Sequence, residues 1–137
     1  MCKLFIFVQI IFILYIASMK RKQTEGDNIT INDIQAEYIS TKDNEYGTIS
    51  YFKLHDKNKL KPIFKKESTD IKMPYWKTDQ NDYILKIKEK YVQTKMDLEN
   101  SDIININIDF IFYDYQEKGI KGYYAKLINA SLIEHDN

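Results

Sequence analysis

The sequence predicts a mostly β protein with five antiparallel strands and one short helix, in a single domain that follows an apolar N-terminal segment. Eleven Tyr and seven Phe are present, and Ile is abundant; aromatic and β-branched side chains pack well on pleated strands. From Tyr46 onward, apolar and polar residues alternate, which is the pattern of half-buried strands. Only four Gly and two Pro occur, which excludes a collagen-like or linker-like chain.

Residues 1–18 form an apolar leader that has more than one interpretation. The segment 4–17 is apolar except for Gln9 and follows a Lys, as in a signal peptide, and it is shorter than the roughly 20 residues of a membrane-spanning helix. Cleavage would make the protein secreted. Alternatively, Met19 with the basic residues 20–22 is the true start, residues 1–18 are an upstream extension, and the protein resides in the cytoplasm or nucleus of a host cell. A retained anchor is a third interpretation.

The body of the chain is expected to comprise a polar leader at 19–45, with a short turn of helix near Asp33–Tyr38, and a β-rich domain at 46–134. The five predicted strands are Tyr46–His55, Leu60–Lys66, Tyr83–Tyr91, Ile103–Tyr115 and Ile120–Ile128. In the fourth strand, Ile104, Ile106, Ile108, Phe110 and Phe112 share one face because side chains alternate along a strand.

Several residues mark the connections between these strands. Pro62 confines the second strand to a sheet edge or an irregular stretch, and residues 92–100 suit a short helix or loop. Gly119 ends a tight turn before the fifth strand, at a position where a positive φ is expected. Within the fifth strand, Gly122 is a candidate bulge. Three strands, a short helical connection and a hairpin are the order of the five-stranded OB barrel. A small β-sandwich or an open antiparallel sheet would fit the same strands.

Residues that enzymes need for chemistry are scarce. The single cysteine, Cys2, lies in the apolar leader, and the two histidines, His55 and His135, are far apart in the chain. Zinc and nucleophilic sites require such residues in clusters. Four scattered glycines cannot form a phosphate-binding loop. We therefore expect no enzyme activity, no cofactor and no metal.

Basic residues concentrate in the middle of a chain that has zero net charge. Residues 47–96 carry twelve Lys against six Asp and Glu, and residues 97–137 carry three Lys against eight acids. In the third predicted strand, Lys86, Lys88 and Lys90 leave the same face because they are two positions apart. Such a lysine face is also typical of a solvated surface that protects a sheet edge.

Lysines interleaved with aromatic residues indicate single-stranded nucleic acid as the ligand. Lysines neutralise phosphates, and bases stack on aromatic rings. The candidate binding residues are Lys53, Lys61, Phe64, Lys65, Trp76, Lys86, Lys88, Lys90, Tyr113, Tyr115, Lys121 and Tyr124.

Four segments, Met19–Lys22, Asp82–Lys88, Ile108–Tyr113 and Tyr123–Ile128, resemble OB-fold single-stranded DNA-binding proteins of large DNA viruses and phages, including the poxvirus type. The resemblance implies a viral protein that coats single-stranded DNA during replication or recombination and performs no chemistry. Those proteins usually end in an acidic tail and carry no secretory leader.

The alternative is a secreted β-sheet protein that binds a host protein, which requires cleavage of the leader. A structural or interaction protein without a ligand is a third reading.

Overall fold

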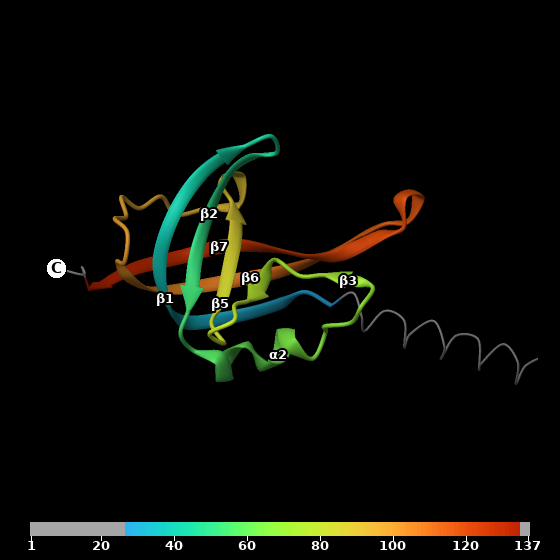
Figure 1. Cartoon of the computed structure of the whole chain (residues 1–137), viewed down its shortest axis with the longest axis horizontal. Coiled ribbons are helices and arrows are strands. Elements are labelled where there is room, and N and C mark those ends of the chain that lie inside the picture. Colours follow the sequence, from blue (N-terminus) through green and yellow to red (C-terminus); the bar gives the residue numbers. More distant parts are fainter. Residues whose placement is uncertain (1–26, 135–137) are drawn as a thin grey trace, which may run out of the picture.

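The computed structural model describes residues 27–134, which form one curled, seven-stranded sheet with a short helix (Figure 1). The strands are β1 (Ile29–Asn44), β2 (Gly47–Leu54), β3 (Ile71–Lys72), β4 (Tyr75–Lys77), β5 (Tyr83–Lys88), β6 (Ile103–Tyr115) and β7 (Ile120–Glu134). The helix α2 (Lys61–Phe64) follows the 3-10 turn η2 (Lys57–Leu60), and two further 3-10 turns are η3 (Glu89–Tyr91) and η4 (Gln116–Lys118). The apolar leader, residues 19–26 and residues 135–137 lie outside the described residues. Within residues 27–134, no helix is long and apolar enough to cross a membrane.

The sheet curls into a half-barrel whose two ends approach each other. Its strand order is β3-β7-β6-β1-β2-β5-β4, and every pair is antiparallel except β3 with β7. In Figure 1, β1, β2 and β5 arch across the long β6–β7 hairpin, the far end of which projects beyond the body. Just after η3, Val92 forms a parallel bridge with Leu127, and the Gln93 N–H donates to the Leu127 carbonyl at 3.0 Å. These contacts span the open side of the half-barrel and bring β5 beside β7.

The hydrophobic core fills the inside of this curl. Fully buried side chains come from four neighbouring strands, namely Ile34, Leu54, Leu85, Ile87, Ile104, Ile106, Ile108 and Phe110. The predicted inward face of the fourth strand is therefore confirmed for Ile104 through Phe110, and its predicted bounds match β6. Leu60 and Ile63 are also fully buried, and they attach η2 and α2 to the barrel.

The predicted turn of helix near Asp33–Tyr38 is wrong, because residues 29–44 form β1, the central strand of the sheet. A bulge explains the error. Ile31 pairs with Ile108 and Ile34 pairs with Ile106, so β1 contains one extra residue at this point. Asp33 takes up the left-handed conformation there (φ 57°), and its N–H donates to Asn107 Oδ1 at 2.8 Å. The bulge changes the apolar spacing from two to three residues, which imitates a helix.

The second predicted strand, Leu60–Lys66, is also wrong, because this segment is η2 followed by α2. Pro62 lies in the first turn of α2, where its missing N–H costs nothing. The two buried residues Leu60 and Ile63 are three positions apart, as on one face of a helix.

The remaining differences concern strand number and strand ends. The sheet has seven strands rather than five, because β1 and the short strands β3 and β4 were not predicted and one predicted strand, Leu60–Lys66, is helical. β5 ends at Lys88 instead of Tyr91, and β7 continues to Glu134 instead of Ile128. The strand predicted at Tyr46–His55 is confirmed as β2, and Gly119 adopts the expected positive φ of 64°.

Gly122 serves close packing rather than a bulge. It pairs in regular register with Tyr113 on β6 and with Lys72 on β3. A Cβ atom at this position would lie 2.4 Å from the Lys72 carbonyl oxygen and 2.8 Å from the Tyr113 hydroxyl. Only glycine lets β3 approach β7 this closely.

Candidate nucleic-acid interface

A groove of about 570 Å³ lies where β5 and η3 meet β3 and the β6–β7 hairpin. We call it the Lys–Tyr groove. Its lysines are Lys72, Lys86, Lys88 and Lys118, and its tyrosines are Tyr46, Tyr91, Tyr113, Tyr115, Tyr123 and Tyr124. None of the described residues that line it is Asp or Glu, so the positive charge in the groove is not neutralised by its own walls.

The lysines reach the groove from three parts of the sheet. Lys86 and Lys88 point outward from β5 because Leu85 and Ile87 on the opposite face are fully buried in the core. Lys72 comes from β3, which pairs with β7 along the edge that β6 leaves open. Lys118 lies in the turn η4 at the tip of the projecting hairpin. Closure of the sheet therefore brings together charges that are distant in the sequence.

Four of the tyrosines form a row along the β7 side of the groove. The Tyr91 and Tyr124 rings are stacked, with centroids 4.4 Å apart and planes inclined by 24°. Tyr113 continues the row, 6.5 Å from Tyr124 at an angle of 26°, and Tyr115 follows at 5.3 Å. Burial, and to a lesser degree the neighbouring Tyr115, raises the pKa of Tyr113, which keeps its phenol neutral. In the Tyr91–Tyr124 stack each ring covers one face of the other, so a base would stack on a ring face that this row leaves uncovered.

The most exposed tyrosines stand at the two ends of the groove. Tyr46, in the turn between β1 and β2, is 80% exposed, and Tyr115 at the end of β6 is 59% exposed. The Tyr46 N–H donates to Asn44 Oδ1 at 2.8 Å, which orders this turn. When a ligand covers a large exposed aromatic side chain, the apolar surface of that side chain is removed from water, which favours binding.

A second hollow of about 510 Å³ adjoins the groove at Tyr46 and Lys88. It adds Lys90 and Lys95, together with one acid, Glu89. The Lys90 ammonium lies 5.0 Å from the centre of the Tyr91 ring, within the range of a cation–π contact. Lys90 is exposed in η3, beyond the end of β5. The expectation that Lys86, Lys88 and Lys90 lie on one strand is therefore wrong for Lys90.

The structure places six of the twelve candidate residues at this surface. Lys86, Lys88, Tyr113, Tyr115 and Tyr124 line the groove, and Lys90 lines the adjoining hollow.

The other six lie elsewhere. Lys53 pairs with Asp82 at 3.4 Å, and Trp76 packs edge-on against Tyr51 with centroids 5.9 Å apart. Lys121 lies on β7, where its backbone is in register with Asp114 of β6 on one side and with Ile71 of β3 on the other. Lys61, Phe64 and Lys65 belong to α2 and its C-terminal end.

Phe64 is not available for stacking on a base. Its ring packs 4.8 Å from Tyr83 and 5.8 Å from Tyr75. Tyr75 in turn packs against Phe110 in the core and donates a hydrogen bond to Glu67. Burial, followed by this carboxylate, raises the pKa of Tyr75. This aromatic cluster attaches α2 to the barrel.

Five lysines and tyrosines of the groove were missing from the candidate set, namely Tyr46, Lys72, Tyr91, Lys118 and Tyr123. One of them carried a recognisable signal, because Tyr46 precedes Gly47 in a turn, where an aromatic ring is exposed. Lys118 lies in the predicted turn that ends at Gly119, and Tyr123 lies in the predicted fifth strand. The positions of Lys72 and Tyr91 depend on the pairing of β3 and Val92 with β7, which no local pattern in the sequence indicates.

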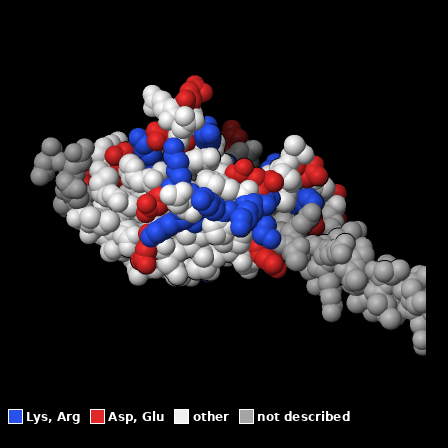
Figure 2. All heavy atoms as spheres, turned by 90° about the horizontal axis from the view of Figure 1, so that it is seen from below, with Lys and Arg blue, Asp and Glu red and all other residues white. Residues whose placement is uncertain are grey.

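A second basic surface surrounds α2, and we call it the lysine belt. Its members are Lys57, Lys59, Lys61, Lys65 and Lys66. Figure 2 looks onto the side on which α2 lies in Figure 1, and lysine side chains form a band across it. The Lys59 ammonium donates to the Asp33 carbonyl, which ties the belt to the bulge in β1.

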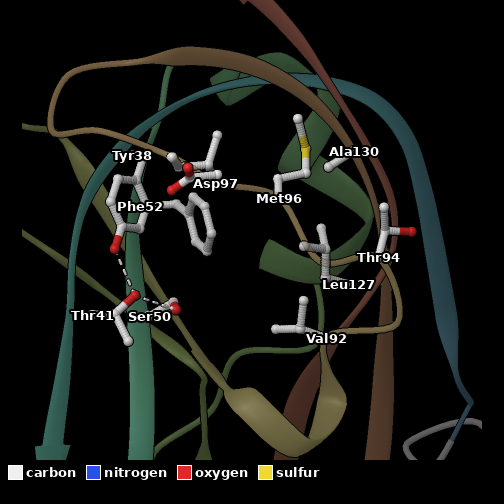
Figure 3. A pocket seen from close by; sticks show the side chains of 11 residues that line it. Tyr38, Thr41, Ser50, Phe52, Val92, Thr94, Met96, Asp97, Leu127 and Ala130 are labelled. Atoms are coloured by element: carbon white, nitrogen blue, oxygen red, sulfur yellow. Dashed lines mark hydrogen bonds between the residues drawn. The ribbon is translucent and has the colours of Figure 1, made fainter.

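A smaller pocket of about 250 Å³ opens between β1, β2, β7 and the segment after η3 (Figure 3). Three hydroxyls form a chain along one wall: Tyr38 OH lies 2.6 Å from Thr41 Oγ1, which lies 2.8 Å from Ser50 Oγ. Met96 and Leu127 lie across the pocket from them. Among the described residues that line it there is neither His nor Cys, so the hydroxyls have no general base of that kind beside them.

Within residues 27–134, no cluster of three or more His, Cys, Asp or Glu side chains is placed to hold a metal ion. No protein-family model, curated protein or solved structure matches this chain, and the two basic surfaces are therefore interpreted from their own chemistry.

Proposed function

We propose that this protein binds single-stranded nucleic acid, with DNA as the expected form, in the Lys–Tyr groove and performs no chemistry on it. The observation that carries the proposal is the composition of the groove, which combines four lysines and six tyrosines without an acidic side chain among its described lining residues. Lysines neutralise phosphates, and stacking on an aromatic ring contributes about 1–3 kcal/mol per base. A sequence-independent coating function requires these two interactions.

The strand order supports the finer proposal that the sheet is an OB-like barrel. The five longest strands are β1, β2, β5, β6 and β7, and β5 reaches β7 through the parallel bridge at Val92. OB barrels bind oligonucleotides on the face of their second and third strands, between the first and the last hairpin turns. Here the corresponding parts are β2 and β5, the turn that holds Tyr46, and the turn that holds Lys118. All four contribute residues to the groove.

The proposal makes a quantitative prediction about salt. For single strands, the logarithm of the affinity falls with the logarithm of the salt concentration with a slope of about −0.7 per neutralised phosphate. Four groove lysines that each contact one phosphate give a slope of about −3. Affinity should then fall roughly fifty-fold between about 50 and 200 mM salt.

Fluorescence anisotropy with a labelled oligo-dT tests this prediction. The double variant Lys86→Gln, Lys88→Gln should bind more weakly, with a slope about half as steep, because two of the four contacts are lost. Lys77 and Lys126 line neither hollow of the surface, so replacing both with Gln is the matched control and should leave affinity and slope unchanged. Absence of binding at low salt would refute the proposal, and equal losses in both double variants would show that the groove is not the site.

A further inference from the structure

We propose that the lysine belt is a second phosphate-binding surface, so that a long single strand contacts the Lys–Tyr groove and the belt at the same time. This inference rests on the proposed function of the groove. It assigns the belt an electrostatic role alone and predicts that the length of the strand determines its affinity and the salt dependence of binding.

The belt lysines stand on a segment that is firmly attached to the barrel. Leu60 and Ile63 are fully buried in the core, and Phe64 packs against Tyr75 and Tyr83. The apolar side of η2 and α2 is thus occupied. Among the belt lysines, Lys57, Lys59, Lys61 and Lys65 are exposed and Lys66 is half-buried. Charges on an ordered segment lose less conformational entropy when they bind than charges on a free tail.

The acids that flank the belt do not neutralise it. Asp56, just before η2, accepts a hydrogen bond from the Gln35 N–H at 3.2 Å, and Glu67, beyond α2, accepts one from the Tyr75 hydroxyl. The nearest carboxylates along the chain are therefore directed toward the barrel. Lys57, Lys61 and Lys65 form no ion pair with a described residue, which leaves three charges for an external anion.

The belt continues toward the groove through a single connecting segment. Lys65 ends the helical part of the connector between β2 and β5, and Lys72 in the same connector lines the groove. A seven-residue step spans at most about 25 Å. A nucleic-acid strand that leaves the groove past Lys72 can therefore reach the belt lysines with its next phosphates.

The chemistry of the belt favours a nucleic-acid backbone over a membrane. Peripheral helices bind membranes by inserting an apolar face beside their basic residues. In this protein, Leu60 and Ile63 face the core and Phe64 is packed in the aromatic cluster. The exposed apolar residue of α2 is Pro62, so no large apolar side chain of α2 remains for insertion. No exposed aromatic side chain accompanies the belt lysines in η2 and α2, so the belt should contact phosphates without stacking on bases.

Oligo-dT of two lengths tests the inference by anisotropy at several salt concentrations. One strand of about 6 nucleotides lies near the lower end, and one of about 20 above the upper end, of the range that a single OB-type surface occupies. For the wild type, the slope for the long strand should be steeper by about 2, as three added contacts require. The triple variant Lys57→Gln, Lys61→Gln, Lys65→Gln should remove this difference and leave the short strand unaffected. Lys42, Lys77 and Lys126 replaced together form the matched control, which should behave as the wild type.

The outcomes separate the two proposals. If the short strand binds but the belt variant binds the long strand with the wild-type slope, the belt inference is wrong and the groove proposal stands. If neither strand binds at low salt, the groove proposal fails and the belt inference falls with it. Phosphatidylserine vesicles serve as a second ligand: binding that the belt variant loses, without a length effect on oligo-dT, would show a membrane contact and overturn the inference.

Discussion

Replacing Gly122 with Ala tests the packing that shapes the groove. The new Cβ would lie 2.4 Å from the carbonyl oxygen of Lys72, whereas ordinary van der Waals contact begins at 3.4 Å. The neighbour is backbone, so β3 would have to move by about 1 Å relative to β7, a displacement that the close packing of proteins resists. The Tyr113 hydroxyl, 2.8 Å from the same Cβ, would have to move as well. Both displaced residues line the groove.

The expected cost is that of overpacking, about 1–3 kcal/mol. In small proteins, the free energy of unfolding falls by about 1–3 kcal/mol per molar urea. The substitution should therefore lower the urea concentration at the unfolding midpoint by roughly one molar. Urea titration followed by circular dichroism measures it. Ser131→Ala on the same strand is the control, because Ser131 is exposed and such changes stay within about 0.5 kcal/mol. If Gly122→Ala unfolds at the wild-type midpoint, β3 does not lie against β7 as described.

Three further changes probe the parts that support the site. Leu60→Ala should lower the free energy of unfolding by about 2–5 kcal/mol because it empties a fully buried position under α2. The control Lys61→Ala should change this free energy by less than about 0.5 kcal/mol. A small loss for Leu60→Ala would show that η2 is not anchored. Burial raises the pKa of Tyr75 above its ordinary value of 10.0, so its contribution to stability is full below pH 10 and is lost as pH rises further. Tyr75→Phe should therefore reduce the alkaline loss of stability, and an identical pH profile for both proteins would contradict this assignment. Ser50→Ala removes one member of the hydroxyl chain in the smaller pocket and should cost about 0.5–1.5 kcal/mol by thermal denaturation; a neutral result would mean that the chain contributes nothing to stability.

The elements that the sequence predicted correctly are those with uninterrupted local patterns. β6 alternates from Ile103 to Tyr115 without a break on the buried side, and both its bounds and its inward face were predicted. β1 was missed because its bulge at Asp33 shifts the apolar positions by one. The α2 segment was misread as a strand because four residues are too few to establish a helical period.

The candidate site was predictable only in part, because local patterns predict single elements but not how distant elements come together. Alternation along one strand places Lys86 and Lys88 together, and likewise Tyr113 and Tyr115. The groove also requires β5 to lie beside β7, and the contacts that bring them together, Val92 with Leu127 among them, join residues far apart in the chain. Side chains such as Lys72 and Tyr91 acquire their place from this closure. Local periodicity therefore predicted the types of side chain and omitted much of their arrangement.

The central claim is that bases stack on the tyrosines of the Lys–Tyr groove, and NMR of the aromatic ring protons tests it most directly. On titration with oligo-dT, the resonances of Tyr46, Tyr91, Tyr115 and Tyr124 should move upfield. Trp76, which is 44% exposed but does not line the groove, should not move and serves as the control within the same sample. Unmoved tyrosine resonances at saturating ligand, or shifts confined to Trp76, would contradict the account.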